Sequence, residues 1–355
     1  MDELNVDSIL KIYETEISKG VKNKRKLYDF ELNKMEYVND IINMLNSERV
    51  GHNRYNIFLI YEPKCRLVMS LPVKDKIINH FVSRNILEKN LTKYLVNRNV
   101  ATRKNMGNDY AIKLVKSDLN SLKKGKEIYA LKLDISKYFY TIDHNILKSM
   151  LCDKLSKKEF NIISKIIDST NNNEILSTIE KTIKDKDLPK YQYGKGLPIG
   201  NMTSQFLSIF YLYKLDYFII HNLKLKHYVR FMDDFIIFDN DLDKLYRAKN
   251  IIIDKLTKEC KLNINTKKTF IVNIKYGVSF LGYTFKVINN KTIIKVKKSS
   301  LDKIKKKLKH KRYLFNTNNI SHYEAFSSIM TYINSYKYTH NNKMKLLINR
   351  YWYNE

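Results

Sequence analysis

The most constraining feature of this chain is the stretch Tyr228–Asp239, which reads YVRFMDDFIIFD. Two adjacent carboxylates, Asp233 and Asp234, lie between two short runs of β-branched and aromatic residues. Such runs favour strands, so the pattern predicts a β-hairpin that carries both acids at its tip. Adjacent like charges repel each other and destabilise the chain unless a partner neutralises them. We expect a pair of divalent cations to be that partner.

A third carboxylate follows from the segment 128–144, which reads IYALKLDISKYFYTIDH. Its first part alternates as a strand does, and Asp134 lies at the C-terminal end of that strand. Asp143 precedes a helical pattern at 145–155, so we interpret it as a helix N-cap. Asp134, Asp233 and Asp234 together match what two-metal phosphoryl transfer needs, because two ions ~3.5–4 Å apart must clamp the attacking and leaving oxygens.

The charge balance indicates the class of partner. Lysine and arginine number 65 against 36 acids, which gives a formal net charge of +29. An AT-rich coding sequence would explain many lysines, but it would not explain the excess of basic over acidic residues. This excess favours a polyanion, either nucleic acid or an anionic membrane surface, and the many aromatic residues favour nucleic acid.

Other sequence features bound the location and the chemistry. The three cysteines lie far apart, which supports neither a zinc ribbon nor a disulfide scaffold. The N-terminus is acidic and has no apolar signal core, and no apolar run approaches the ~20 residues of a membrane span. We therefore expect a cytoplasmic protein with no membrane partner.

Further segments carry features that suit nucleotide handling. They are a hairpin at 55–72 with Lys64 and Arg66 near its bend, a glycine-rich loop at 191–200 before a helix at 201–215, a turn at 265–269 with Lys268, a strand at 278–285 with Gly282 inside it, and a basic segment at 286–312 that contains a helix. Taken alone, a basic hairpin bend is more often a solvated surface than a phosphate grip. The combination and the order of these segments carry more weight.

In this order the segments resemble the motifs of reverse transcriptases, over about 55–285. The matching stretches are FMDD (231–234) for the catalytic hairpin, LDISKYF (133–139) for the first aspartate box, GLPIGNMTSQ (196–205), NTKKT (265–269), FLGY (280–283) and EPKCR (62–66). The resemblance implies an α+β, right-hand polymerase fold with fingers, a palm made of an antiparallel sheet plus helices, and a helical thumb. It places an N-terminal extension and fingers at 1–127, the palm at 128–285 with a fingers-like helical insertion at about 145–190, and a basic helical thumb at 286–355.

The resemblance also implies roles for individual residues. The catalytic residues are Asp134, Asp233 and Asp234, and the same three bind two Mg²⁺ ions, or Mn²⁺, together with the backbone carbonyl of Ile135. The nucleotide-binding residues are Lys64, Arg66, Phe139, Gln205 and Lys268, with Phe139 as the bulky side chain that excludes a 2′-hydroxyl. The primer and template residues are Ile199, Gly200, Phe231, Met232, Leu281, Gly282, Lys305, Lys306 and Lys307.

The function implied is RNA-directed DNA polymerisation, in which dNTPs are added to the 3′-hydroxyl of a DNA or RNA primer on an RNA template. The pattern IGxxxSQ at 199–205 resembles bacterial diversity-generating retroelement enzymes, whereas group II intron enzymes usually carry Gln before the glycine and Ser-Pro after it. The same pattern is similar to abortive-infection and other antiphage defence enzymes that make cDNA or untemplated DNA, and this alternative stays open. Further partners expected beside template, primer and dNTPs are a structured non-coding RNA and an accessory protein, and the accessory protein would favour the diversity-generating system. A third hypothesis is a catalytically inactive RNA-binding protein.

Overall fold

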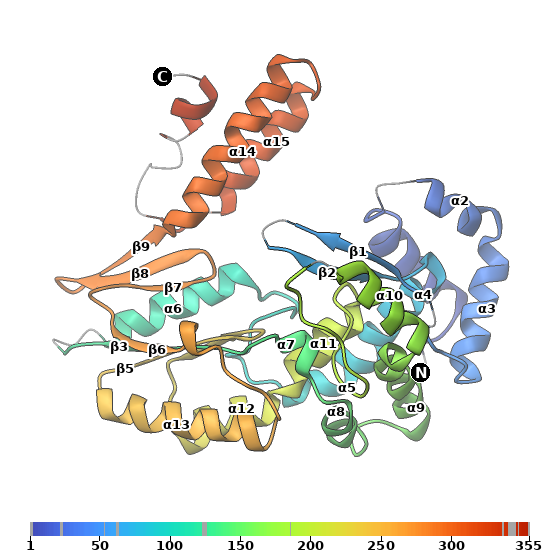
Figure 1. Cartoon of the computed structure of the whole chain (residues 1–355), viewed down its shortest axis with the longest axis horizontal. Coiled ribbons are helices and arrows are strands. Elements are labelled where there is room, and N and C mark those ends of the chain that lie inside the picture. Colours follow the sequence, from blue (N-terminus) through green and yellow to red (C-terminus); the bar gives the residue numbers. More distant parts are fainter. Residues whose placement is uncertain are drawn as a thin grey trace. The chain divides into compact units, whose positions relative to one another are not determined.

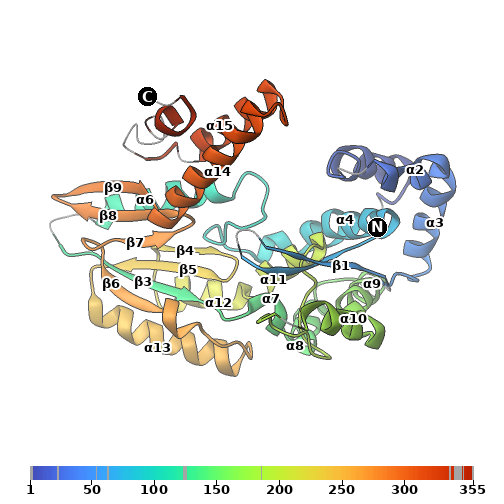
Figure 2. The same cartoon turned by 45° about the horizontal axis from the view of Figure 1, so that its top comes forward.

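The computed structural model describes residues 3–21, 24–52, 54–61, 64–122, 126–184, 186–335, 337–339, 346 and 348–353. Glu62 and Pro63 of the EPKCR stretch lie outside the described residues. The chain divides into two compact units. The first contains residues 1–102, 135–224 and 250–265, and the second contains residues 103–134, 225–249 and 266–355. Figures 1 and 2 colour these segments along the sequence.

The first unit is mainly helical and contains one hairpin. Its elements are α1 (Val6–Ile12), α2 (Arg25–Leu32), α3 (Lys34–Asn46), β1 (Asn56–Ile60), β2 (Arg66–Ser70), α4 (Val73–Val82), α5 (Lys89–Leu91), α7 (Tyr138–Thr141), α8 (His144–Leu151), α9 (Lys157–Ile167), α10 (Asn173–Ile183), α11 (Met202–Tyr211) and α12 (Tyr213–Tyr217). Short 3₁₀ or π-helical segments cover Tyr13–Ile17, Ser83–Glu88, Thr92–Tyr94, Asp168–Asn171 and Phe218–Asn222.

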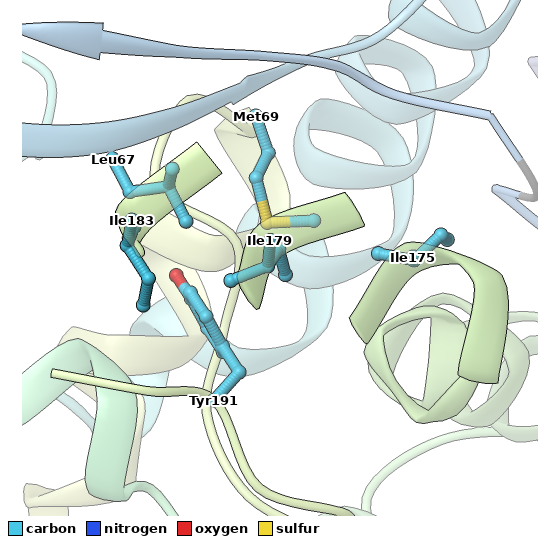
Figure 3. Close-up of a cluster of buried hydrophobic side chains, with 6 residues drawn as sticks. All are labelled: Leu67, Met69, Ile175, Ile179, Ile183 and Tyr191. Atoms are coloured by element: carbon cyan, nitrogen blue, oxygen red, sulfur yellow. The ribbon is translucent and has the colours of Figure 1, made fainter. Parts of the chain in front are cut away.

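The predicted hairpin at 55–72 is confirmed, and its alternating side chains explain how it is held. Strands β1 and β2 pair antiparallel with Phe58 opposite Val68. Leu67 and Met69 point from one face of β2 into a buried cluster with Tyr191 and with isoleucines of α10 (Figure 3). The three α10 isoleucines recur every four residues, which gives that helix one apolar face. The hairpin is therefore fixed from one side, and its other face carries Arg66.

The second unit contains two antiparallel sheets and a pair of long helices. Its elements are α6 (Asn108–Leu122), β3 (Tyr129–Asp134), β4 (Tyr228–Phe231), β5 (Asp234–Asp239), β6 (Phe270–Asn273), β7 (Val278–Phe280), β8 (Tyr283–Ile288), β9 (Lys291–Val296), α14 (Lys298–Asn316) and α15 (His322–Ser335). Shorter segments cover Thr266–Lys268 and Asn349–Tyr353. Helix α13 (Leu242–Lys258) begins in the second unit and ends in the first.

The larger sheet of the second unit, called the central sheet below, has the strand order β4-β5-β3-β6. All of its pairings are antiparallel, as the resemblance implied. Strand β3 is buried from Ala130 onward, so both of its faces are covered. Helix α6 contacts β4, β5 and also β9 of the smaller sheet, which has the order β7-β8-β9. The pairing of these strands thus fixes the backbone positions of the acidic residues at one end of the central sheet.

Two of the sequence predictions were wrong in detail. The segment 278–285 is not one strand, because Leu281 and Gly282 form a two-residue turn between β7 and β8. Both turn residues have positive φ, 48° and 83°, the conformation that tight hairpins require. The segment after residue 286 is not helical at first, because Lys291–Val296 forms strand β9 and pairs with β8. The predicted division into fingers, palm and thumb stays a prediction.

The basic helix predicted within 286–312 is confirmed as α14. It lies alongside α15 in both views (Figures 1 and 2). Ile304 and Leu308 of α14 pack against Ile329 and Ile348. Burial of these four side chains holds the helices together, while Lys306 and Lys307 remain exposed to solvent. In the part of the chain that the structure describes, no helix has the length and apolar character needed to span a membrane.

Candidate active site

The three predicted acidic residues lie together at one end of the central sheet. Asp134, the last residue of β3, is directly opposite Asp234, the first residue of β5. Side chains that face each other across an antiparallel pair point to the same side of the sheet. Asp233 precedes Asp234 in the turn between β4 and β5. The predicted hairpin and its pairing with the Asp134 strand are therefore both confirmed.

The turn that carries Asp233 is held by a buried arginine. Met232 adopts the left-handed region with φ 58°, which is unfavourable for a residue with a side chain. Arg230 is fully buried and donates a hydrogen bond from Nη1 to the carbonyl oxygen of Met232 at 2.9 Å. We did not predict a role for Arg230, although a charged residue inside an apolar strand is a visible signal. Its contact fixes the backbone next to Asp233.

Two lysines neutralise two of the three acids. Lys268 Nζ lies 2.9 Å from Oδ1 and 2.8 Å from Oδ2 of Asp134, and the Asp134 backbone N–H faces Thr269 Oγ1 at 3.4 Å. Lys132 Nζ donates a hydrogen bond to Oδ1 of Asp234. The chain therefore supplies cations of its own beside these acids, in addition to the divalent ions that we expected. We also missed Lys132, although the alternation of β3 places it on the same face as Asp134.

Burial changes the ionisation of this cluster. Burial raises the pKa of Asp234 to about 6, although the Lys132 ammonium acts to lower it and the carboxylates of Asp233 and Asp134 act to raise it. Burial lowers the pKa of Lys132, although all three carboxylates favour its protonated form. These mutual influences show that the three acids and Lys132 form one electrostatic cluster.

Asp234 is expected to make the free energy of unfolding depend on pH. Its pKa in the folded state, about 6, is above the ordinary value of 3.8, so the folded protein binds a proton more readily than the unfolded chain between these values. The contribution of this carboxyl to the free energy of unfolding therefore falls by on the order of 2 kcal/mol as the pH rises from 4 to 6. Denaturant unfolding at pH 4.5 and at pH 7 measures this effect. Between these pH values the free energy of unfolding should fall more for wild type than for Asp234→Asn. Equal pH dependence would contradict the assignment.

The donor set fits a divalent metal ion in its chemistry. Carboxylate oxygens from Asp134, Asp233 and Asp234, with the backbone carbonyl of Ile135, are the hard ligands that Mg²⁺ and Mn²⁺ prefer. Within the described ranges, no three His, Cys, Asp or Glu side chains already converge as a metal-binding group. The carboxylates of Asp134 and Asp234 are turned to Lys268 and Lys132.

Backbone hydrogen bonds connect the glycine-rich loop to the elements that carry two predicted nucleotide-binding residues, Phe139 and Arg66. The N–H of Leu197 donates to the carbonyl of Phe139 at 2.7 Å, and the N–H of Met69 donates to the carbonyl of Ile199 at 2.8 Å. The glycine-rich loop is thereby tied both to α7, which carries Phe139, and to β2, which begins at Arg66. Gln205 lies on α11 just after the loop, and Lys64 is exposed just before β2.

A buried histidine also supports the glycine-rich loop. His144 Nε2 lies 2.7 Å from the carbonyl oxygen of Gly196, and burial lowers the pKa of this imidazole. Asp143 caps α8 by accepting hydrogen bonds from Asn145 N and Ile146 N, as predicted. Sequence reasoning missed His144, because a histidine at the start of a helix gives no signal of a partner 52 residues away.

The predicted primer and template residues of the second unit lie on three elements. Phe231 ends β4 and faces Asp234 across the sheet. Leu281 and Gly282 form the β7–β8 turn, and Phe280 before them places its ring 4.6 Å from Lys132 Nζ. Lys305, Lys306 and Lys307 lie on α14, where Lys305 pairs with Asp302 at 3.5 Å. The FLGY stretch is thus connected to the acidic cluster through Lys132.

Solved structures of telomerases share this fold. Apo telomerase from Candida tropicalis, truncated from its C-terminal domain, matches with a TM-score of 0.51 and 13% identity over 72% of this chain and 59% of that chain. Telomerase from Candida albicans, in complex with a TWJ fragment of telomeric RNA, matches with a TM-score of 0.51 and 12% identity. The match covers 85% of this chain and 59% of that chain. These matches show the right-hand polymerase fold that the sequence predicted.

The family model described as reverse transcriptase (RNA-dependent DNA polymerase) matches residues 62–285, which is more than half of the chain. The chain belongs to the reverse transcriptase family, whose domains use divalent metal ions. No curated protein matches the sequence. The chain covers 53% of the apo Candida tropicalis telomerase, which matches at a TM-score of 0.48 and 15% identity over 74% of this chain. It therefore spans between half and two thirds of these telomerase chains.

Proposed function

We propose that this protein is an RNA-directed DNA polymerase that adds dNTPs to a primer 3′-hydroxyl on an RNA template. The observation that carries the proposal is the position of Asp134, Asp233 and Asp234 at one end of the central sheet. When bound there, two Mg²⁺ or Mn²⁺ ions would activate the 3′-hydroxyl and neutralise the triphosphate charge. Asp134, Asp233, Asp234 and the Ile135 carbonyl would hold them.

The remaining residues bind and orient the reactants in this proposal. Lys64, Arg66 and Lys268 supply cationic groups for the triphosphate, with Arg66 suited to bidentate contacts. Gln205, Ile199 and Gly200 support the incoming nucleotide and the template base. Phe231, Met232, Leu281 and Gly282 hold the primer end, and the exposed lysines of α14 follow the phosphate backbone.

The experiment that tests the proposed function is primer extension by the purified chain. Matched RNA and DNA templates of one sequence are offered with the same primer, dNTPs and Mg²⁺. The proposal expects extension on RNA, with a product complementary to the template. Extension on DNA alone, or no extension with either Mg²⁺ or Mn²⁺, would contradict it.

Phe139 is proposed to exclude ribonucleotides. Its side chain is half-buried on α7, and its backbone is tied to the glycine-rich loop. Shortening this side chain to valine should admit a 2′-hydroxyl and raise rNTP incorporation relative to dNTP incorporation by about tenfold or more. Tyr193→Ala is a suitable control, because Tyr193 is an exposed aromatic residue of the 191–200 loop. An unchanged ratio in Phe139→Val would remove Phe139 from this role.

For the biological system we propose a bacterial diversity-generating retroelement, with a structured RNA and an accessory protein as partners. The support is the IGxxxSQ stretch, in which an apolar Ile199 replaces the amide that intron enzymes carry. Ile199 holds the loop through its backbone carbonyl, so its side chain can differ without loss of the loop. A neighbouring template repeat and variable repeat would support this system. A phage-restriction phenotype that is lost on Asp134→Ala would favour antiphage defence instead.

A further inference from the structure

Lys268 and Lys132 each bind a carboxylate that a metal ion would need. Lys268 contacts both oxygens of Asp134, and Lys132 contacts Oδ1 of Asp234. Two of the three acids at this end of the sheet are thus neutralised by the chain itself. A divalent cation that binds these carboxylates has to compete with the two ammonium groups.

The lysines of the two ion pairs differ strongly in exposure. The Lys268 side chain is 49% exposed and the Lys132 side chain is 9% exposed, while their partners Asp134 and Asp234 are 11% and 27% exposed. An exposed ammonium group stays solvated when it leaves its partner, so its exchange costs little. Breaking a buried pair is costly because it leaves an uncompensated charge inside the protein.

The surroundings of Lys132 add to this difference. Its ammonium lies 4.6 Å from the centre of the Phe280 ring, so the ring face helps to retain the cation. Its backbone is part of β3, which lies between β5 and β6 in the central sheet and is paired with both. Lys268 belongs instead to the short segment Thr266–Lys268, which has no buried residues.

We propose that the two lysines are built-in counter-ions with opposite fates. Lys268 is the displaceable partner of Asp134 and is exchanged for a divalent cation when the site loads. Lys132 is a positioning residue that stays on Asp234 and limits this carboxylate as a metal ligand. The inference rests on the proposed function for its setting, since the released Lys268 ammonium becomes available to the triphosphate only in a working polymerase.

The first test measures metal binding without nucleotide or template. Mn²⁺ is titrated calorimetrically into the purified full chain as wild type, Lys268→Met and Lys267→Met. Removing a competing ammonium should tighten Mn²⁺ binding in Lys268→Met by about fivefold. Lys267→Met controls for the loss of one positive charge in the same exposed turn and should change affinity by less than about twofold. Unchanged or weaker binding in Lys268→Met would overturn the proposal.

The second test concerns Lys132 and uses thermal unfolding with and without Mg²⁺. Lys132→Met leaves Asp234 buried without its partner, so its Tm without metal should fall and its rise on adding Mg²⁺ should exceed that of wild type. The double variant Lys132→Met, Asp234→Asn removes both charges and should regain Tm while losing the extra response to Mg²⁺. An Mg²⁺ response equal to that of wild type, or a double variant as unstable as the single one, would overturn the role of Lys132.

Both readouts are separate from polymerisation. If primer extension fails while the Mn²⁺ and Mg²⁺ responses follow the expected pattern, the proposed function is wrong and the counter-ion roles stand. If extension succeeds while Lys268→Met binds Mn²⁺ like wild type, the counter-ion proposal alone is wrong.

Discussion

Replacing Asp233 with asparagine is expected to reduce primer extension on an RNA template by about 10³-fold or more. The amide keeps the size of the side chain but removes the negative charge that, in the proposed function, would hold a divalent cation. Losing about 4 kcal/mol of transition-state stabilisation corresponds to a factor of 10³ in rate. We expect the same for Asp134→Asn, because Asp134 is the acid on the neighbouring strand.

The acids are not expected to be equivalent. Asp234 already interacts with the buried Lys132, so Asp234→Asn should leave more activity than the other two replacements. Asp239→Asn is a matched control at the far end of the same strand β5, where this carboxylate pairs with Lys244 at 2.8 Å. Single-turnover extension at saturating Mg²⁺ measures all four variants. An Asp233→Asn enzyme with more than a tenth of wild-type activity would contradict the assignment.

Replacing Gly200 with alanine is expected to destabilise the glycine-rich loop and to lower extension activity strongly. Gly200 has φ 125°, and a Cβ at this position would lie 2.6 Å from the carbonyl oxygen of Met69 in β2. Backbone strain and the clash together should cost on the order of 3 kcal/mol. The loop would have to move away from β2, and the hydrogen bond from Met69 N to the Ile199 carbonyl would be lost with it.

The contribution of the clash can be separated from that of backbone strain. Gly107 has φ 105°, but a Cβ there would meet no atom within 4 Å. Gly107→Ala therefore introduces the backbone strain without the steric clash. In denaturant unfolding it should lose clearly less free energy of unfolding than Gly200→Ala. Equal losses of stability in the two variants would show that the contact between the loop and β2 does not restrict residue 200.

Much of the acidic site could be predicted because its signals are local. The apolar runs around Asp233 and Asp234 predict two strands, and a short turn leaves one way to pair them. The strand ending at Asp134 is equally clear from its alternation. Their juxtaposition follows from the family resemblance, and the observed register places Asp134 opposite Asp234.

Other features depend on contacts between residues far apart in the chain, so the local sequence indicates them only weakly. The bond between Lys132 and Asp234 joins positions 102 residues apart, so the lysine alone does not reveal its partner. The turn at Leu281–Gly282 was missed because apolar residues continue through it, and leucine rarely adopts a positive φ. The strand Lys291–Val296 was hidden by its basic composition, although its pairing with β8 decides its conformation.

We propose that the acidic end of the central sheet catalyses RNA-templated DNA synthesis. The most direct measurement is extension of a labelled primer on a defined RNA by the purified chain with dNTPs and Mg²⁺, followed by sequencing of the product. We expect DNA complementary to the RNA from wild type and none above background from Asp134→Asn or Asp233→Asn. Equal product from wild type and these variants, or no product from any of them, would contradict it.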